Sequence, residues 1–152
     1  MKKISIILIS ITFFSVSCTK DKGNGMIVST NMDISYLDKS GNDLLDPNTT
    51  GYYSPSNMHV FKIVDGVKKE INNPMMQFPK DFLIYKNDSL KRYFLRIFLD
   101  NPTYLQLNQN TTDTMTCEID NSNGNKILKK FSDNGKLYWD NNLKPQRITI
   151  IK

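Results

Sequence analysis

The chain alternates apolar and polar residues with a period of two over much of its length. The segment TTDTMTCEID at 111–120 shows this most clearly, because Met115, Cys117 and Ile119 fall on one face and polar residues fall on the other. Successive side chains of a β-strand point to opposite faces of its sheet, so this alternation predicts a half-buried strand. Short apolar or alternating runs predict further strands at 32–37, 58–64, 67–71, 82–85, 92–100, 103–107, 125–131, 136–139 and 146–151.

Short turn signals separate these predicted strands. Asp65-Gly66 lies between two of them, and Asn134-Gly135 lies between two others. Both dipeptides favour two-residue hairpin turns, which need a positive φ at both central positions. The segment 92–100 is apolar on both faces, which predicts a strand inside a sheet. No long segment shows a period of 3.6 residues, and a short helix is expected at most around Asp88–Arg92.

Many short strands, with a turn signal about every 8–12 residues, are typical of an all-β fold. We therefore predict a single domain over 26–152, built as an antiparallel β-sandwich of immunoglobulin-like or transthyretin-like architecture. A chain of this length is large enough to bury a substantial core.

The first 17 residues have the three-part pattern of a secretory signal peptide. Lys2 and Lys3 form a basic start, an apolar run of 13 residues covers 4–16, and the small residue Ser17 follows it. The run is shorter than the roughly 20 residues that a membrane-spanning helix needs. We expect 1–17 to be a signal peptide, helical in the precursor and removed on export.

One of the two cysteines, Cys18, directly follows this signal. The tripeptide Ser15-Val16-Ser17 and Cys18 together resemble the lipobox of bacterial lipoproteins, whose cysteine sulfur receives a diacylglyceryl group before cleavage. The resemblance implies that Cys18 is lipidated and becomes the N-terminus of the mature chain. Several acyl chains hold a domain stably at a bilayer, at about 0.8 kcal/mol per buried methylene. Residues 18–25 are then the lipidated cysteine and a polar, flexible tether.

Three segments of the mature chain carry a wider resemblance. They are DKSGNDLLDP at 38–47, VDGVKKEI at 64–71 and TTDTMTCEI at 111–119. Together with the lipobox they are similar to small, uncharacterised lipoproteins of the Bacteroidota, a group that implies a cell-envelope location and no particular activity. Enteric lipoproteins kept at the inner membrane carry Asp after the cysteine, so Thr19 favours the outer membrane. The periplasmic and the surface face both stay open.

Positive charge is concentrated in the last part of the chain. Residues 121–152 hold seven Lys or Arg against two Asp, whereas residues 19–120 hold 11 against 13 acidic residues. This basic segment is expected to be a solvated hairpin, or else a face that meets an acidic partner such as lipid phosphate or a polyanionic glycan. The net charge is too modest for an exported nucleic-acid-binding protein, so no nucleic acid is expected as a partner.

Few side chains suggest chemistry. Cys117 alternates with polar neighbours and is expected to be a buried core residue. His59 is the single histidine, which is too few for a usual zinc site. The loop 38–46 offers the oxygen ligands that Ca²⁺ prefers but misses the EF-hand spacing, so an ordinary turn is expected there. Trp139 is expected in the core, with stacking on a sugar as the alternative.

The sequence contains none of the familiar catalytic motifs, such as G-x-S-x-G, H-E-x-x-H or G-x-x-x-x-G-K-[ST]. We therefore expect a non-enzymatic domain, without cofactor or metal, that is anchored to the membrane through Cys18 and binds a protein or a glycan. The alternatives are a structural, fimbrillin-like subunit and, less favoured, an accessory hydrolase. The sequence does not single out any ligand-binding residue.

Overall fold

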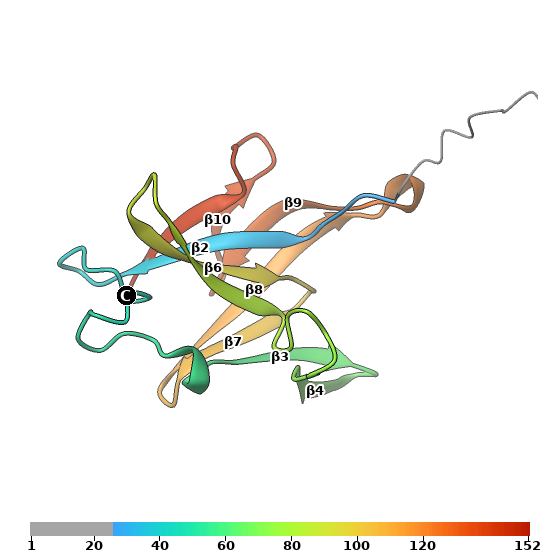
Figure 1. The fold of residues 1–152 in the computed structure, drawn as a ribbon. Coiled ribbons are helices and arrows are strands. Elements are labelled where there is room, and N and C mark those ends of the chain that lie inside the picture. Colours follow the sequence, from blue (N-terminus) through green and yellow to red (C-terminus); the bar gives the residue numbers. More distant parts are fainter. Residues whose placement is uncertain (1–25) are drawn as a thin grey trace, which may run out of the picture.

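Two β-sheets make up the fold in the computed structural model, which describes residues 26–152 (Figure 1). The predicted signal peptide, Cys18 and the tether therefore lie outside the described residues. The larger sheet contains β1 (Val28–Ser29), β3 (His59–Val64), β4 (Val67–Glu70), β7 (Thr103–Asn108), β8 (Thr111–Asp120), β9 (Lys126–Asp133) and β10 (Lys136–Asp140). The smaller sheet contains β2 (Asn31–Leu37), β5 (Phe82–Asn87), β6 (Arg92–Phe98) and β11 (Arg147–Ile151).

Both sheets are mixed, because each contains one parallel strand pair among antiparallel pairs. The larger sheet has the order β1-β9-β8-β7-β3-β4, with β10 also paired to β9, and the smaller has the order β11-β2-β6-β5. The prediction of an all-β fold with two sheets is confirmed. Two pairs depart from the expected antiparallel arrangement, because β1 runs parallel to β9 and β11 runs parallel to β2. Hairpins cannot join parallel strands, and each of these pairs joins segments that are far apart in the chain.

The hydrophobic core lies between the sheets. Met115 on β8 is fully buried and Cys117 nearly so, as the alternation predicted. Trp139 on β10 is 1% exposed, and its indole Nε1 donates a hydrogen bond to the carbonyl oxygen of Leu143 at 2.8 Å. The predicted core position of Trp139 is confirmed, and a ring buried in this way cannot stack on a sugar.

β6 is the interior strand that its two apolar faces predicted. It pairs with β2 on one side and with β5 on the other. Leu95 and Ile97 point into the core and are fully buried. Phe94 lies on the opposite face, where the guanidinium of Arg147 covers its ring at 4.7 Å. Both faces of β6 therefore carry buried apolar side chains.

The predicted hairpin turns have the expected backbone. Asp65 and Gly66 have φ values of 55° and 76°, and Asn134 and Gly135 have φ values of 49° and 79°. Positive φ at both positions matches the right-handed twist of the flanking strands.

The prediction of a short helix around Asp88–Arg92 is wrong, because residues 88–91 form the turn between β5 and β6. The turn is held by a hydrogen bond from the backbone N–H of Leu90 to Oδ1 of Asn87 at 2.9 Å. The helices that the structure describes are two 3-10 turns, η1 (Pro55–Asn57) and η2 (Ser122–Gly124). Within residues 26–152, no helix is long and apolar enough to cross a membrane.

The described chain starts at one end of the sandwich, and the other end lies far from this start. At one end Met26 precedes β1, and the N–H of Ile27 donates to Oδ1 of Asn125 in the β8–β9 connection at 2.9 Å. We call this the Met26 end. β2 and β9 run away from it, so the β7–β8 and β9–β10 turns lie at the opposite, far end (Figure 1).

Candidate functional site

A polar pocket of about 360 Å³ opens on the outer face of the larger sheet, towards the far end. Its lining consists of uncharged amide side chains and one imidazole. These residues are Asn57, His59, Gln106, Asn108, Gln109 and Asn110. We call this site the amide pocket.

The strand register brings the walls of the amide pocket together. His59 at the start of β3 is the cross-strand partner of Gln106 on β7. Val60 and Leu105, the neighbours of these two residues, are fully buried. Because side chains alternate between the faces of a sheet, His59 and Gln106 point outwards.

Turns supply the rest of the lining. The pairing of β7 with β8 shifts register between Gln106 and Asn108, just before the connecting turn. Within that turn, the N–H of Asn110 donates to Oδ1 of Asn108 at 2.9 Å, which leaves the amide nitrogen of Asn108 as a donor. Asn57 ends η1, where its N–H donates to the carbonyl oxygen of Ser54 at 2.9 Å. The local hydrogen bonds therefore order the backbone that presents the amides.

His59 is oriented by a neighbouring carboxylate. Its Nδ1 lies 2.7 Å from Oε1 of Glu70 on β4. A partner at Nδ1 fixes the orientation of an imidazole and leaves Nε2 for other contacts. Within residues 26–152, Nε2 of His59 has no hydrogen-bond partner.

An aromatic strip borders the amide pocket on the same outer face. Phe61 on β3 and Tyr104 on β7 are cross-strand partners. The ammonium of Lys68 on β4 lies 5.1 Å from the ring centre of Phe61 and 4.1 Å from that of Tyr104. In such cation–π contacts the ammonium lies over the face of each ring. The outer face therefore combines ordered amides with two half-buried aromatic rings.

The lining of the amide pocket is rich in hydrogen-bonding groups. Each amide side chain carries both a donor and an acceptor group, so it can bind either side of a hydroxyl. Glycoside hydrolysis commonly needs two carboxyl groups on opposite sides of the scissile bond, and none of the six lining residues has one.

A second, apolar groove of about 490 Å³ lies beside β5. Its lining includes Pro55, Pro79, Phe82, Leu83 and Ile84. β5 forms an edge of the smaller sheet, and among the described strands it pairs only with β6. An edge strand beside an apolar groove is a geometry that can accept an extended peptide.

The acidic loop 38–46 uses its carboxylates to hold its own backbone. Oδ1 of Asp38 accepts hydrogen bonds from the N–H groups of Ser40 and Asn42, both at 2.8 Å. These bonds, led by one from the Asn42 side chain, lower the pKa of Asp38. Oδ2 of Asp43 accepts from the N–H of Tyr93 at 2.8 Å, which ties the loop to β6. The oxygens considered for Ca²⁺ thus stabilise a turn, as the sequence predicted.

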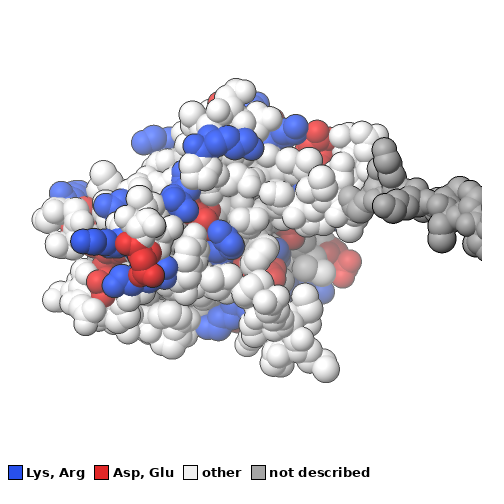
Figure 2. Space-filling view, turned by 45° about the horizontal axis from the view of Figure 1, so that its top comes forward, with Lys and Arg blue, Asp and Glu red and all other residues white. Residues whose placement is uncertain are grey.

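Three of the seven basic residues in the C-terminal segment form ion pairs. Lys129 lies 3.2 Å from Asp120, and Lys130 lies 2.9 Å from Glu118. Lys152 contacts the carboxylate of Asp113. In the view of Figure 2, blue and red side chains lie beside one another instead of forming a field of one sign. These ion pairs reduce the free positive charge of the segment without removing it.

Cys117 has the properties of a packing residue. Its thiol donates a weak hydrogen bond to the carbonyl oxygen of Asp100 at 3.6 Å, and burial raises its pKa to about 11. A thiol that stays protonated at neutral pH is a poor nucleophile. The predicted core role of Cys117 is confirmed.

Comparison of the chain with protein-family models, with curated proteins and with solved structures finds no match.

The amide pocket was not predicted from the sequence, although His59 was considered there as the single histidine. The remaining lining residues come from η1, β7 and the following turn, and the register of β3 against β7 alone brings them together. The only sequence signal was the run of Gln and Asn at 106–110.

Proposed function

We propose that this chain is a lipid-anchored, non-enzymatic domain of the cell envelope that binds a carbohydrate in the amide pocket. The single observation that carries the proposal is the lining of that pocket, in which five amides and one imidazole surround a space of about 360 Å³. This volume falls in the range of about 300–1,000 Å³ that is typical of small-molecule sites.

The chemistry of the lining favours a neutral sugar. Sugar hydroxyls are donors and acceptors at once, as are the amide groups of Asn57, Gln106 and Gln109. The six lining residues include no Asp, Glu, Lys or Arg, which disfavours a strongly charged ligand. Phe61 and Tyr104 add half-buried aromatic area beside the pocket, with the ammonium of Lys68 over both rings.

The position of the amide pocket suits a domain anchored at Cys18. The pocket lies towards the far end, and the chain enters the described fold at the Met26 end. Residues 19–25 reach at most about 23 Å when fully extended, at roughly 3.3 Å per residue. A domain held on this flexible tether can present the amide pocket away from the bilayer, where envelope glycans are accessible.

The apolar groove beside β5 supports a second candidate, a protein partner. An extended segment could add a strand to β5 and place apolar side chains against Phe82 and Ile84. A structural, fimbrillin-like subunit would require this same edge strand and groove. We favour the glycan because the amide pocket gathers oriented hydrogen-bonding side chains, whereas the groove is lined mostly by apolar side chains.

Isothermal titration calorimetry of the full chain in detergent against neutral gluco-, manno- and xylo-oligosaccharides tests the proposal. We expect one series to bind and Gln106→Ala to weaken binding about tenfold, because one or two buried hydrogen bonds are lost. Thr116→Ala is the matched control, since Thr116 is exposed on the outer face of β8 and outside the pocket. Absence of binding to all three series, or equal weakening by both variants, would contradict a carbohydrate site here.

A further inference from the structure

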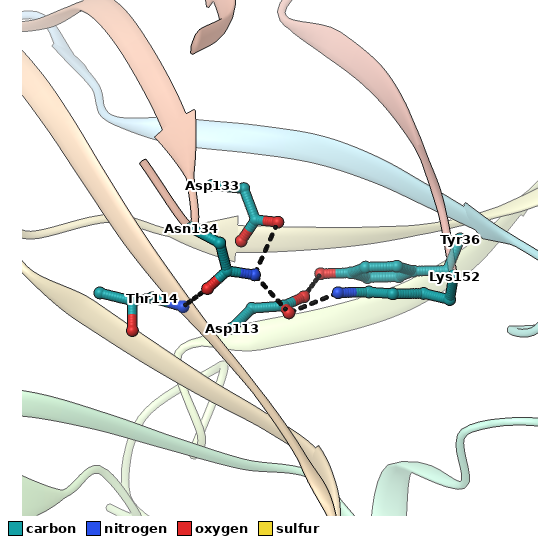
Figure 3. Close-up of polar contacts among 6 residues, drawn as sticks. All are labelled: Tyr36, Asp113, Thr114, Asp133, Asn134 and Lys152. Carbon is teal, nitrogen blue, oxygen red and sulfur yellow. Dashed lines mark hydrogen bonds and ion pairs between the residues drawn. The ribbon is translucent and has the colours of Figure 1, made fainter. Parts of the chain in front are cut away.

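A cluster of polar side chains is buried between the sheets at the far end (Figure 3). Asp113 is the first buried residue of β8, Asp133 is the last residue of β9, and Tyr36 lies near the end of β2. These three residues are 1%, 3% and 0% exposed. Lys152 follows β11 and reaches into the same space. We call these residues, with Asn134, the far-end cluster.

The amine of Lys152 is held against the carboxyl group of Asp113. Nζ of Lys152 contacts Oδ1 of Asp113, and the hydroxyl of Tyr36 donates to Oδ2 at 3.1 Å (Figure 3). The ammonium also lies 5.5 Å from the ring centre of Tyr36. The backbone N–H of Lys152 donates to the carbonyl oxygen of Leu37 at 2.8 Å, which fixes the base of the side chain. The two groups therefore face each other, with the Asp113 side chain 1% exposed and the Lys152 side chain 19% exposed.

A second carboxyl group stands next to this pair. Nδ2 of Asn134 donates to Oδ1 of Asp113 at 3.0 Å and to Oδ2 of Asp133 at 3.3 Å. The other oxygen of Asp133, Oδ1, is buried and has no hydrogen-bond partner among the described residues. Burial and the neighbouring charge of Asp113 raise the pKa of Asp133 to about 6. A carboxyl group with a pKa near neutrality is suited to act as a general acid.

We propose that Lys152 and Asp113 condense into an intramolecular isopeptide bond, with Asp133 as the proton-transfer group. A proton passes from the Lys152 ammonium to the Asp113 carboxylate, which gives a neutral amine and a neutral acid. Nζ of Lys152 then attacks Cγ of Asp113. Asp133 donates its proton to the departing hydroxyl and recovers one from the nitrogen. One C–O bond breaks, one C–N bond forms, and one water molecule leaves without any oxidant or metal.

The surroundings of the far-end cluster favour this condensation. Burial of the Asp113 side chain limits the access of water that would hydrolyse the product. Proximity supplies much of the barrier reduction, because the reacting groups need no diffusional encounter. After reaction, the hydroxyl of Tyr36 can donate to the oxygen that the Asp113 side chain retains.

The bond would be a covalent clamp between the two sheets. It would tie the end of β11, in the smaller sheet, to the start of β8 in the larger sheet. It would also close the chain from residue 113 to residue 152, which restricts the unfolded state as a disulfide does. The described residues contain one cysteine, Cys117, so an intrachain disulfide among them is not available for this purpose.

Peptide mass spectrometry of the full chain tests the bond. Trypsin releases residues 97–126, which contain Asp113, and residues 148–152, which end in Lys152. The bond predicts one branched peptide whose mass is the sum of the two minus one water. Recovery of both peptides only in linear form would overturn the proposal.

Variants separate the bond from the fold. Lys152→Arg keeps the positive charge, but its guanidinium is a poor nucleophile, so we expect linear peptides and an unchanged circular dichroism spectrum. Asp133→Asn is also expected to give linear peptides, and undiminished cross-linking there would overturn the role of Asp133. The exposed pair Lys130–Glu118, with Nζ and Oε1 2.9 Å apart, serves as an internal control that should stay unlinked.

Discussion

Asp113 and Asp133 share one hydrogen-bond donor, because Nδ2 of Asn134 lies 3.0 Å from Oδ1 of Asp113 and 3.3 Å from Oδ2 of Asp133. Two carboxyl groups on neighbouring strands are thereby held close together in a buried site. Lys152 supplies a positive charge to Asp113, whereas Asp133 keeps one oxygen without a partner. Ionised Asp133 is therefore costly, and the stability of the fold should depend on its protonation.

The first prediction concerns this pH dependence, measured in a Lys152→Arg background where no isopeptide bond can form. Burial and the charge of Asp113 raise the pKa of Asp133 to about 6, from about 3.9 in an unfolded chain. The folded state then binds more protons between these two pH values. The free energy of unfolding should fall by about 2–3 kcal/mol as the pH rises through this window.

Urea unfolding of Lys152→Arg between pH 4 and 7 or so measures this slope. Adding Asp133→Asn should remove the Asp133 contribution and leave the protein more stable at pH 7. The positive charge at position 152, the phenol of Tyr36 and the carboxyl of Asp113 also face this group, and the double variant keeps all three. Equal pH slopes with and without Asp133→Asn would show that Asp133 titrates normally.

The second prediction concerns the outer face of the smaller sheet. Nε and Nη2 of Arg96 lie 2.7 and 2.9 Å from the two oxygens of Asp33, and the hydroxyl of Tyr85 donates to Asp33 at 2.7 Å. Asp33 is 5% exposed and the Arg96 side chain is 39% exposed, so Asp33→Asn would replace a buried carboxylate with a weaker acceptor for the guanidinium. We expect a loss of about 2 kcal/mol in the free energy of unfolding.

Asp65→Asn is the matched control for Asp33→Asn. Asp65 forms the tight turn between β3 and β4 with a φ of 55°, a conformation that Asn adopts well, and its side chain is 87% exposed. This variant should change stability by less than about 0.5 kcal/mol. Similar losses for both variants in urea titrations would contradict a structural role for the Asp33–Arg96 pair.

The third prediction concerns the anchor. Cys18→Ala should abolish incorporation of labelled fatty acid in cells and release the chain from the membrane fraction, because one acylated cysteine carries all of the proposed attachment. Cys117→Ala is the control and should leave labelling and membrane retention unchanged. Equal labelling of the wild type and Cys18→Ala would rule out lipidation at Cys18.

The strands could be predicted because their signals are local. The alternation at 111–120 marked β8, and Asp65-Gly66 marked the turn between β3 and β4. The same alternation places Asp113 on the core face with Met115, and this was the available sign of a buried carboxylate. The pairing of β2 with β11 could not be predicted, because no local pattern specifies a parallel partner so far along the chain.

The candidate site depends on the same kind of long-range register. His59 and Gln106 face each other because β3 pairs with β7, and nothing near either residue in the sequence indicates this. The ion pairs of Lys129 and Lys130 could not be predicted from the sequence either. The sequence therefore overestimated the free positive charge of the basic segment. Composition could suggest a charged surface, whereas pairing across strands determines how much of that charge is free.

The most direct test of the carbohydrate-binding proposal is an NMR titration of the ¹⁵N-labelled full chain in detergent with the oligosaccharide series that binds best. The proposal predicts that the largest backbone amide shifts appear at His59, Gln106 and the 108–110 turn, on the outer face near the far end. Shifts confined to β5 and its apolar groove, or an absence of shifts at saturating sugar, would contradict carbohydrate binding in the amide pocket.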